Sequence, residues 1–210
     1  MDSAQVAKTL AGLGSATLGE SGALTMHQRV RPVWPGATVA SPAYTVRCTP
    51  GDNLAIHAAV TRAPAGHVLV VDVGNIAERG YWGEVLTTAA ESRGLAGLVI
   101  DGGVRDSAAL EAHGFPVFAT MVALRGATKI LPGANAGAVR VGGAPVSFGD
   151  WIVGDGDGVV AIPRGRLTEV ITAGRARAEK EERMFAQLRD GRSTVDLLEL
   201  DISPVVEHGE

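Results

Sequence analysis

Three short apolar runs constrain the fold of this chain more than any other feature of its sequence. They cover residues 67–72, 96–101 and 116–120, and glycine or proline lies at or beside the start of each. Runs of this length that are apolar throughout are typical of strands buried on both faces of a parallel sheet. Helix-like segments at about 83–93 and 106–113 separate them. This alternation predicts an α/β core with parallel pairing.

The flanking segments extend this core. Before it we expect a helix at 3–12 that ends at Gly12 and Gly14, an irregular stretch from 17 to 37, a strand at 37–48, and a helix at 53–62 with Asp52 as its N-cap. After it, short strands near 138–142, 145–148, 150–153 and 158–162 predict antiparallel β structure packed on the core. A long charged helix at about 164–190 is expected to end the regular structure, followed by a loose tail at 204–210. Since no repeat or linker interrupts the chain, we predict one domain spanning 1–210.

Charge and cysteine content exclude several classes of function. The formal net charge is −4 without a basic stripe, so we expect no nucleic acid partner. The one cysteine, Cys48, cannot form an internal disulfide, lacks metal-ligand spacing, and is expected to be a small core residue. The N-terminus lacks a secretion signal and no apolar run is long enough to span a bilayer. These features predict a cytoplasmic protein without a membrane partner.

Candidate chemistry gathers where two predicted strands end and two helices begin. Glu84, Val85 and Leu86 open one helix, and Arg105 and Asp106 open the next. In open α/β sheets ligands bind at this edge, and unpaired helix N-terminal amides favour anions. Two carboxylates suit Mg²⁺ or Mn²⁺, and a guanidinium beside such a cation favours stabilisation of an enolate.

Each of these residues also has a structural interpretation. Asp106 can be an N-cap, Glu84 a surface residue that complements the helix dipole, and Arg105 a clamp on loop carbonyls. His57 is interpreted as a packed, hydrogen-bonded histidine and Asn53 as a turn residue. The glycine-rich segment 154–158 is interpreted as a tight turn, because it is too short for a calcium loop and lacks the terminal Glu.

A set of motifs covering about residues 14–190 resembles the RraA-like family. These are Arg31-Pro32 with Trp34-Pro35-Gly36, Pro50-Gly51-Asp52-Asn53-Leu54 with His57, Trp82-Gly83-Glu84, Arg93-Gly94, residues 97–106, Phe115-Pro116-Val117, and Gly149-Asp150 with Asp155 and 157–160. The segment Asp-Gly-Gly-Val-Arg-Asp at 101–106 is the most specific. This family includes 4-hydroxy-4-methyl-2-oxoglutarate and 4-carboxy-4-hydroxy-2-oxoadipate aldolases and the regulator of ribonuclease activity.

The resemblance implies a class II, metal-dependent pyruvate aldolase with an αββα-type fold, assembled as a trimer or hexamer. It assigns Asp106 as the direct ligand of Mg²⁺ or Mn²⁺, with Glu84 acting through a metal-bound water. Arg105 would bind pyruvate and stabilise its enolate, while the amides of Val85 and Leu86 take the carboxylate with Asn53 nearby. The resemblance also implies that a Glu from a neighbouring subunit completes the site. Glu181 matches it best, and Glu182 is the alternative.

The implied substrate is a 2-oxo acid such as 4-hydroxy-4-methyl-2-oxoglutarate, with oxaloacetate decarboxylation as a side activity. The aldolases carry Asp where this chain has Glu84, with twenty residues between that position and Arg105-Asp106. The extra methylene of Glu shifts the carboxylate relative to that of Asp, and the rate of catalysis is more sensitive to such a shift than binding is. We therefore treat aldolase turnover as an expectation distinct from metal and pyruvate binding. The ribonuclease regulators lack the Asp after Arg, so Asp106 disfavours the alternative of a non-catalytic protein that binds a ribonuclease. A related 2-oxo acid decarboxylase is a further alternative.

Overall fold

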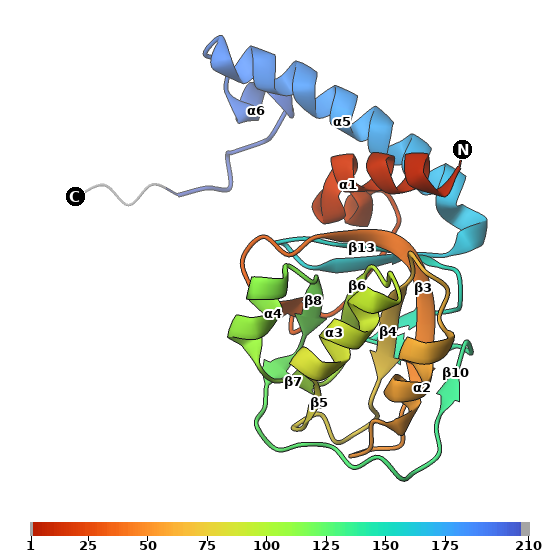
Figure 1. Ribbon diagram of the computed structural model, residues 1–210. Helices are drawn as coiled ribbons and strands as arrows, with labels where there is room; N and C mark the ends of the chain where they lie inside the picture. Colours follow the sequence, from red (N-terminus) through yellow and green to blue (C-terminus); the bar gives the residue numbers. More distant parts are fainter. Residues whose placement is uncertain (1, 207–210) are drawn as a thin grey trace.

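A parallel sheet lies at the centre of the fold (Figure 1). In the computed structural model, which describes residues 2–206, its neighbouring strands are, in order, β3 (Val39–Arg47), β4 (Val68–Asp72), β6 (Gly97–Ile100) and β8 (Val117–Ala119). The helices that connect successive strands are α2 (Leu54–Arg62), α3 (Glu84–Ser92) and α4 (Ser107–His113). The expected α/β class with parallel strand–helix units is therefore confirmed.

The apolar runs form strands because both faces of the parallel sheet are covered. In β4, Leu69 and Val71 pack in a cluster with residues of the three connecting helices. Val68 and Val70 point the other way and pack with the β11–β12 hairpin, which consists of β11 (Val139–Val141) and β12 (Ala144–Val146). All four side chains have no exposed surface. A strand of this kind needs no polar face, which explains why the run does not alternate.

Antiparallel strands extend the sheet at both edges. Some of them are expected from the short apolar segments after residue 138. Beside β3 lies β13 (Trp151–Gly154), followed by β14 (Val159–Ile162) and β1 (Leu24–Thr25). Two further strands join the sheet, β2 (Arg31–Pro32) on β8 and β10 (Ala134–Asn135) on β3. Of the four short strands expected after residue 138, β13 and β14 therefore belong to the central sheet, while β11 and β12 form a separate hairpin that packs on it.

Helices α1 (Ser3–Glu20) and α5 (Leu167–Arg189) pack together over β13 and β14 (Figure 1). The expected helix end at Gly14 is wrong: the backbone leaves helical geometry there (φ 75°), but a second helical segment continues to Glu20. It restarts because the Asp155 carboxylate accepts hydrogen bonds from the Ser15 amide and hydroxyl, at 2.7 and 2.6 Å. Asp155 lies in the β13–β14 turn, as predicted for this glycine-rich segment.

The long charged helix is confirmed as α5, preceded by the 3₁₀ turn η1 (Arg164–Arg166). It does not end the regular structure, because α6 (Thr194–Leu197) follows, capped by the Ser193 side chain. Of the expected loose tail, residues 207–210 lie outside the described residues. None of the helices within 2–206 combines the length and apolar character needed to span a bilayer.

A small parallel sheet, which the sequence did not predict, links the central strands to their helices. Its strands in the described chain are β5 (Gly80–Trp82), β7 (Gly103–Val104) and β9 (Met121–Val122), which follow β4, β6 and β8 respectively. Close strand approach requires glycine here, because a Cβ at Gly103 would lie 2.6 Å from the carbonyl oxygen of Arg79. This sheet places the starts of α3 and α4 next to each other.

Cys48 is buried where β3 ends, as expected for a core residue. Its side chain is 5% exposed, and its amide bonds the carbonyl of Asp72 at 2.8 Å. Burial raises the pKa of the thiol to about 12, and the negative charges of Asp52 and Asp72 contribute in the same direction.

We therefore expect the Cys48 thiol to be inert in the folded protein at pH 8, because the reactive thiolate is suppressed and shielded. Reaction with a chromogenic disulfide reagent should be slow without denaturant and complete within minutes in guanidinium chloride. A native reaction rate like that of a free thiol would contradict this burial.

Candidate functional site

A cavity of about 170 Å³ opens where α3 and α4 begin, beside β5 and β7. Five of the residues singled out from the sequence line it together: Asn53, Val85, Leu86, Arg105 and Asp106. They come from three helix beginnings and from the end of β7, so the fold unites segments more than fifty residues apart. The cavity is the strongest candidate for a functional site.

Asp106 occupies the N-cap position of α4 but does not cap that helix. Its backbone is left-handed (φ 59°, ψ 37°), a conformation that costs a non-glycine residue about 1 kcal/mol or more. Its Oδ2 instead accepts a hydrogen bond from the Glu84 amide at 3.1 Å, across the gap between the two helices. The strained backbone thus directs this carboxylate into the cavity.

Gly83 provides the room for this arrangement. A Cβ at position 83 would overlap Asp106 Oδ2 and lie 3.1 Å from Arg105 Cγ. Its backbone is extended, so the requirement is for space rather than for an unusual dihedral angle.

Arg105 is partly exposed and lies next to Asp106. Its Nε is 3.7 Å from Asp106 Oδ2, and its side chain is 46% exposed. Among the described residues its guanidinium donates no hydrogen bond to a loop carbonyl, in contrast to the clamp interpretation. Its donors therefore remain available to a ligand in the cavity.

The first turn of α3 presents free amides to the same cavity. Within residues 2–206, the N–H groups of Val85 and Leu86 have no acceptor, as is normal at a helix start. Leu86 is buried, whereas the Val85 side chain is 78% exposed. Both residues can nevertheless hold a small carboxylate through their backbone.

Asn53 and His57 form the wall on α2, one helical turn apart. Asn53 is 4% exposed; its amide nitrogen donates to the Tyr81 carbonyl at 2.8 Å, while its Oδ1 is buried without a partner in the described chain. His57 Nε2 is likewise buried and unpaired there. The interpretation of His57 as a hydrogen-bonded core histidine is therefore wrong. Burial is the main reason why the pKa of His57 is lowered, and the positive charge of Lys129 contributes in the same direction. The ring is therefore neutral near pH 7.

Asp52 anchors the loop that carries Lys129. Its buried carboxylate accepts hydrogen bonds from the Thr128 hydroxyl and the Ile130 amide, both at 2.7 Å, and from the Leu131 and Leu54 amides at 3.1 and 2.8 Å. Asn53, not Asp52, takes the N-cap position of α2. Burial alone would raise the pKa of Asp52, but these hydrogen bonds outweigh it and lower the pKa to about 2. Local sequence does not reveal this role, since three of the four partners lie 76–79 residues away.

The metal donors that one chain brings to this cavity are few. Asp106 is the carboxylate in its wall, and the Glu84 side chain, 57% exposed, lies beside His113 with 3.7 Å between Oε1 and Nε2. No cluster of three or more His, Cys, Asp or Glu side chains suited to a metal ion occurs within residues 2–206. The two hard oxygen donors fit Mg²⁺ or Mn²⁺ better than zinc, and the remaining coordination positions would fall to water, substrate or another chain.

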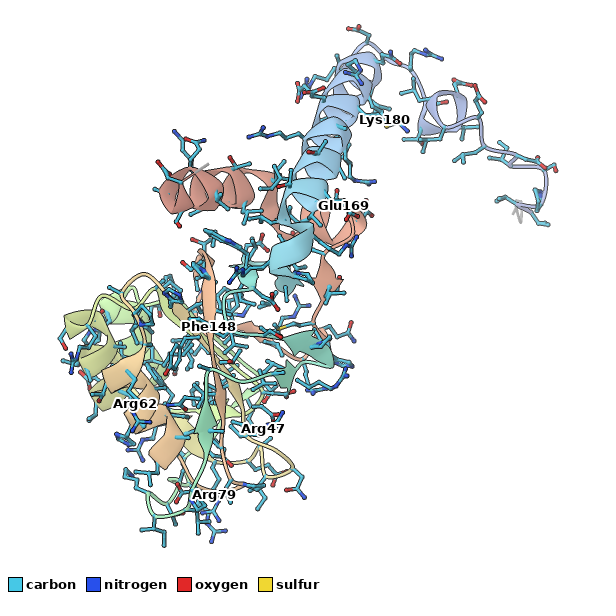
Figure 2. The ribbon with its side chains drawn as sticks, turned by 90° about the vertical axis from the view of Figure 1, so that its right-hand side faces the viewer. Arg47, Arg62, Arg79, Phe148, Glu169 and Lys180 are labelled. Carbon is cyan, nitrogen blue, oxygen red and sulfur yellow. The ribbon has the colours of Figure 1, made fainter. Side chains whose placement is uncertain are left out.

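Glu181 and Glu182 lie far from this cavity within one chain. Figure 2 shows Lys180, the residue before Glu181, at the opposite end of the molecule from Arg79, which immediately precedes β5. Glu181 forms an ion pair with Arg177 on the same helix at 2.8 Å, and Glu182 lies 3.8 Å from Arg189. Neither side chain can reach the cavity of its own chain.

Comparison with known proteins shows the family of this chain. Residues 11–161 match the sequence profile of the RraA-like family, described as Aldolase/RraA. A protein of Halalkalibacterium halodurans, provisionally named 4-hydroxy-4-methyl-2-oxoglutarate aldolase, is 33% identical over 161 residues, which is 77% of each chain.

Solved structures agree with this match. An uncharacterised protein from Pseudomonas syringae pv. tomato superimposes with a TM-score of 0.82 at 25% identity, over 91% of this chain and 92% of that one. RraAS2 of Streptomyces coelicolor, described as an unusual member of the RNase ES inhibitor RraA family, gives a TM-score of 0.76 at 27% identity, over 87% and 96%.

Replacing Asp52 with Asn should destabilise the protein by about 2 kcal/mol at pH 7, because hydrogen bonds to a charged acceptor contribute about 1.5–3 kcal/mol. The folded pKa of about 2 lies below the ordinary value of 3.8, so the carboxylate contributes stability above about pH 4 and loses it as the pH falls towards 2. Urea unfolding of both proteins at pH 7 and at pH 2.5 measures the difference.

The exposed turn residue Asp157 offers a matched control, and Asp157→Asn should leave stability unchanged. A deficit of Asp52→Asn that stays equally large at both pH values would refute the contribution of the ionised carboxylate.

Proposed function

Because this chain belongs to the Aldolase/RraA family, we propose that it is a divalent-metal-dependent lyase that cleaves a 4-hydroxy-2-oxo acid and releases pyruvate. A substrate such as 4-hydroxy-4-methyl-2-oxoglutarate fits the proposal, with oxaloacetate as a second substrate. The observation that carries it is the carboxylate of Asp106, held by a strained backbone beside Arg105 and the free amides of α3.

The residues at the cavity fit a hard cation such as Mg²⁺ or Mn²⁺. Asp106 would bind it directly, and Glu84 would act through a water molecule. When bound, such a cation supplies a Lewis acid for the negative charge that develops on the substrate's keto oxygen.

The chain's own groups bind and polarise the 2-oxo acid. The amides of Val85 and Leu86 hold its carboxylate at the positive end of α3. The Arg105 guanidinium donates to the keto oxygen and stabilises the enolate as the C3–C4 bond breaks. Glu84, acting through a water molecule, would take the proton of the C4 hydroxyl. The electrons of that O–H bond form the C4 carbonyl of the second product, and the electrons of the broken C3–C4 bond pass into the enolate. Protonation at C3 then gives pyruvate.

Loss of carbon dioxide from oxaloacetate generates the same three-carbon enolate, so decarboxylation should accompany aldol cleavage. Arg105 and the α3 amides would act identically in both reactions, because the shared part of the two substrates is the 2-oxo acid end.

Catalysis explains the local structure better than a purely protein-binding role does. The similarity to a ribonuclease inhibitor family raises that alternative. Docking to another protein does not require a left-handed Asp106 or a glycine that leaves room for its carboxylate. Strained backbone of this kind is most often retained at active sites.

We further propose that the protein acts as a trimer or hexamer in which Glu181 completes the site of a neighbouring copy. Support comes from the shape of the molecule: α5 extends beyond the sheet (Figure 1) and carries exposed Phe185 near its end. Further exposed apolar side chains follow it, at Leu198, Leu200, Ile202, Val205 and Val206. Several exposed apolar side chains within one segment of the chain favour contact with another chain.

Removal of the cation or of the guanidinium should abolish pyruvate release. We expect excess EDTA to reduce release to background and Mg²⁺ or Mn²⁺ to restore it. Arg105→Ala should lose about 10²–10³-fold in kcat, the usual effect of removing one donor to a developing oxyanion. Coupling to lactate dehydrogenase follows the pyruvate formed.

Arg125→Ala is the matched control, since Arg125 is an exposed cation of the neighbouring loop that does not line the cavity. Undiminished turnover in EDTA, or wild-type turnover by Arg105→Ala, would exclude the proposed chemistry.

The contribution of Glu181 can be separated from that of Glu182 with two matched variants. Glu181→Gln should lower kcat by about 10²-fold, as expected for loss of a group that takes part in proton transfer, while Glu182→Gln keeps wild-type kcat. Co-refolding Glu181→Gln with Arg105→Ala should restore part of the activity, because mixed assemblies contain some sites with both residues intact. Full activity of both Gln variants would rule out this shared site.

A further inference from the structure

A histidine at the end of α4 lies between two glutamates of α3. His113, the last residue of α4, places Nδ1 2.8 Å from Glu91 Oε2 and Nε2 3.7 Å from Glu84 Oε1. The two glutamates are separated by about two helical turns, so both project from the same face of α3. The imidazole therefore links α3 to α4, which lie side by side (Figure 1).

Glu91 fixes the ring of His113. An ionised carboxylate only accepts hydrogen bonds, so the 2.8 Å contact places a hydrogen on Nδ1. The His113 side chain is 25% exposed, and Leu110, about one turn earlier on α4, has no exposed surface. A hydrogen bond and the packing of α4 thus hold the ring, and its second nitrogen is left to face Glu84.

The backbone of Glu84 is fixed, whereas its carboxylate is not. The Glu84 amide donates to Asp106 Oδ2 at 3.1 Å, and the Glu84 carbonyl accepts from the Thr88 hydroxyl at 3.0 Å. Within residues 2–206 the carboxylate accepts no hydrogen bond, but it lies within ion-pair distance of His113. This contact therefore decides where the flexible side chain of Glu84 lies.

The contact holds the Glu84 carboxylate away from the cavity. Both sequence neighbours, Gly83 and Val85, line the cavity together with Asp106, but Glu84 does not. Instead its side chain, 57% exposed, extends to the last residue of α4. Because the Glu84 amide is bonded to Asp106, rotation about the side-chain bonds can bring the carboxylate to the Asp106 side. Glu84 thus has two alternative positions.

We propose that His113 is a positioning residue that retains the Glu84 carboxylate outside the cavity, so that Glu84 serves a cation there only after it leaves the histidine. The inference rests on the proposed function for the role of Glu84 beside Mg²⁺ or Mn²⁺. Since the histidine and the cation site compete for one carboxylate, loss of the His113–Glu84 contact strengthens cation binding. His113 thereby sets the cation concentration at which the site fills.

Equilibrium titration with Mn²⁺ at pH 7 tests this competition without requiring turnover. His113→Leu removes both ring nitrogens and should tighten Mn²⁺ binding about threefold, the effect expected of a partly exposed ion pair. Removal of a histidine can also favour a nearby cation through its charge alone. The Glu84→Gln background separates the two effects. Competition for the carboxylate predicts no change when His113→Leu is added there, whereas a general charge effect predicts the same tightening.

Two further variants separate this role from damage to α4. His113→Gln places an N–H donor near the position of Nε2 and should keep the wild-type Kd for Mn²⁺. His113→Asn places its donor near Nδ1, so it keeps a partner for Glu91, loses the contact with Glu84 and should bind Mn²⁺ as tightly as His113→Leu. Equal Mn²⁺ affinity of the wild type and His113→Leu, equal affinity of the Gln and Asn variants, or tightening that persists in Glu84→Gln would overturn the proposal.

Pyruvate release from 4-hydroxy-4-methyl-2-oxoglutarate distinguishes this failure from failure of the proposed function. A protein that shows the expected order of Mn²⁺ affinities but releases no pyruvate would retain the role of His113 and lose the lyase assignment. A protein that releases pyruvate, while His113→Leu binds Mn²⁺ no more tightly than the wild type, would retain the lyase assignment and lose the role of His113.

Discussion

Burial of both faces of the parallel strands is the constraint from which the rest of the molecule follows. Strands such as β4 offer no polar face to water, so one face is covered by α2, α3 and α4 and the other by the β11–β12 hairpin. Parallel strands also deliver every connection to the same edge of the sheet. Helix beginnings, with their unpaired amides, therefore converge there, and a site for anions arises from backbone geometry before any side chain is specified.

Side chains then give this edge its selectivity. The cavity combines cationic groups with one carboxylate, Asp106, that is directed inward at the expense of backbone strain. Gly83 leaves room for that carboxylate, and Asp52 holds the opposite wall through hydrogen bonds to the 128–131 loop. Hydrogen bonds between distant segments join the walls of the cavity, and preorganisation of this kind favours binding of a developing charge.

The sequence predicted the elements whose signals are local. The strands at 67–72, 96–101 and 116–120 are recognisable because a two-sided core demands continuous apolar residues. The convergence of Val85, Leu86, Arg105 and Asp106 followed from the rule that ligands bind at strand ends. The β5–β7–β9 sheet escaped prediction because strands of two or three residues carry no periodicity. The roles of Asp52 and His57 depend on partners in the 128–131 loop, which the local sequence does not reveal.

The position of β13 in the sheet has a consequence for how the chain acquires its structure. β13 pairs with β3, joining Trp151 to Pro42, so this sheet edge closes only after more than a hundred further residues have been synthesised. The parallel units can assemble earlier, while the outer edge of β3 stays open to intermolecular pairing. Such long-range closure is slow compared with helix formation. During synthesis on the ribosome, the chain would therefore pass through an aggregation-prone intermediate in which this edge of β3 is unpaired. The edge is protected from intermolecular pairing once residues 151–154 have been synthesised and have paired with it.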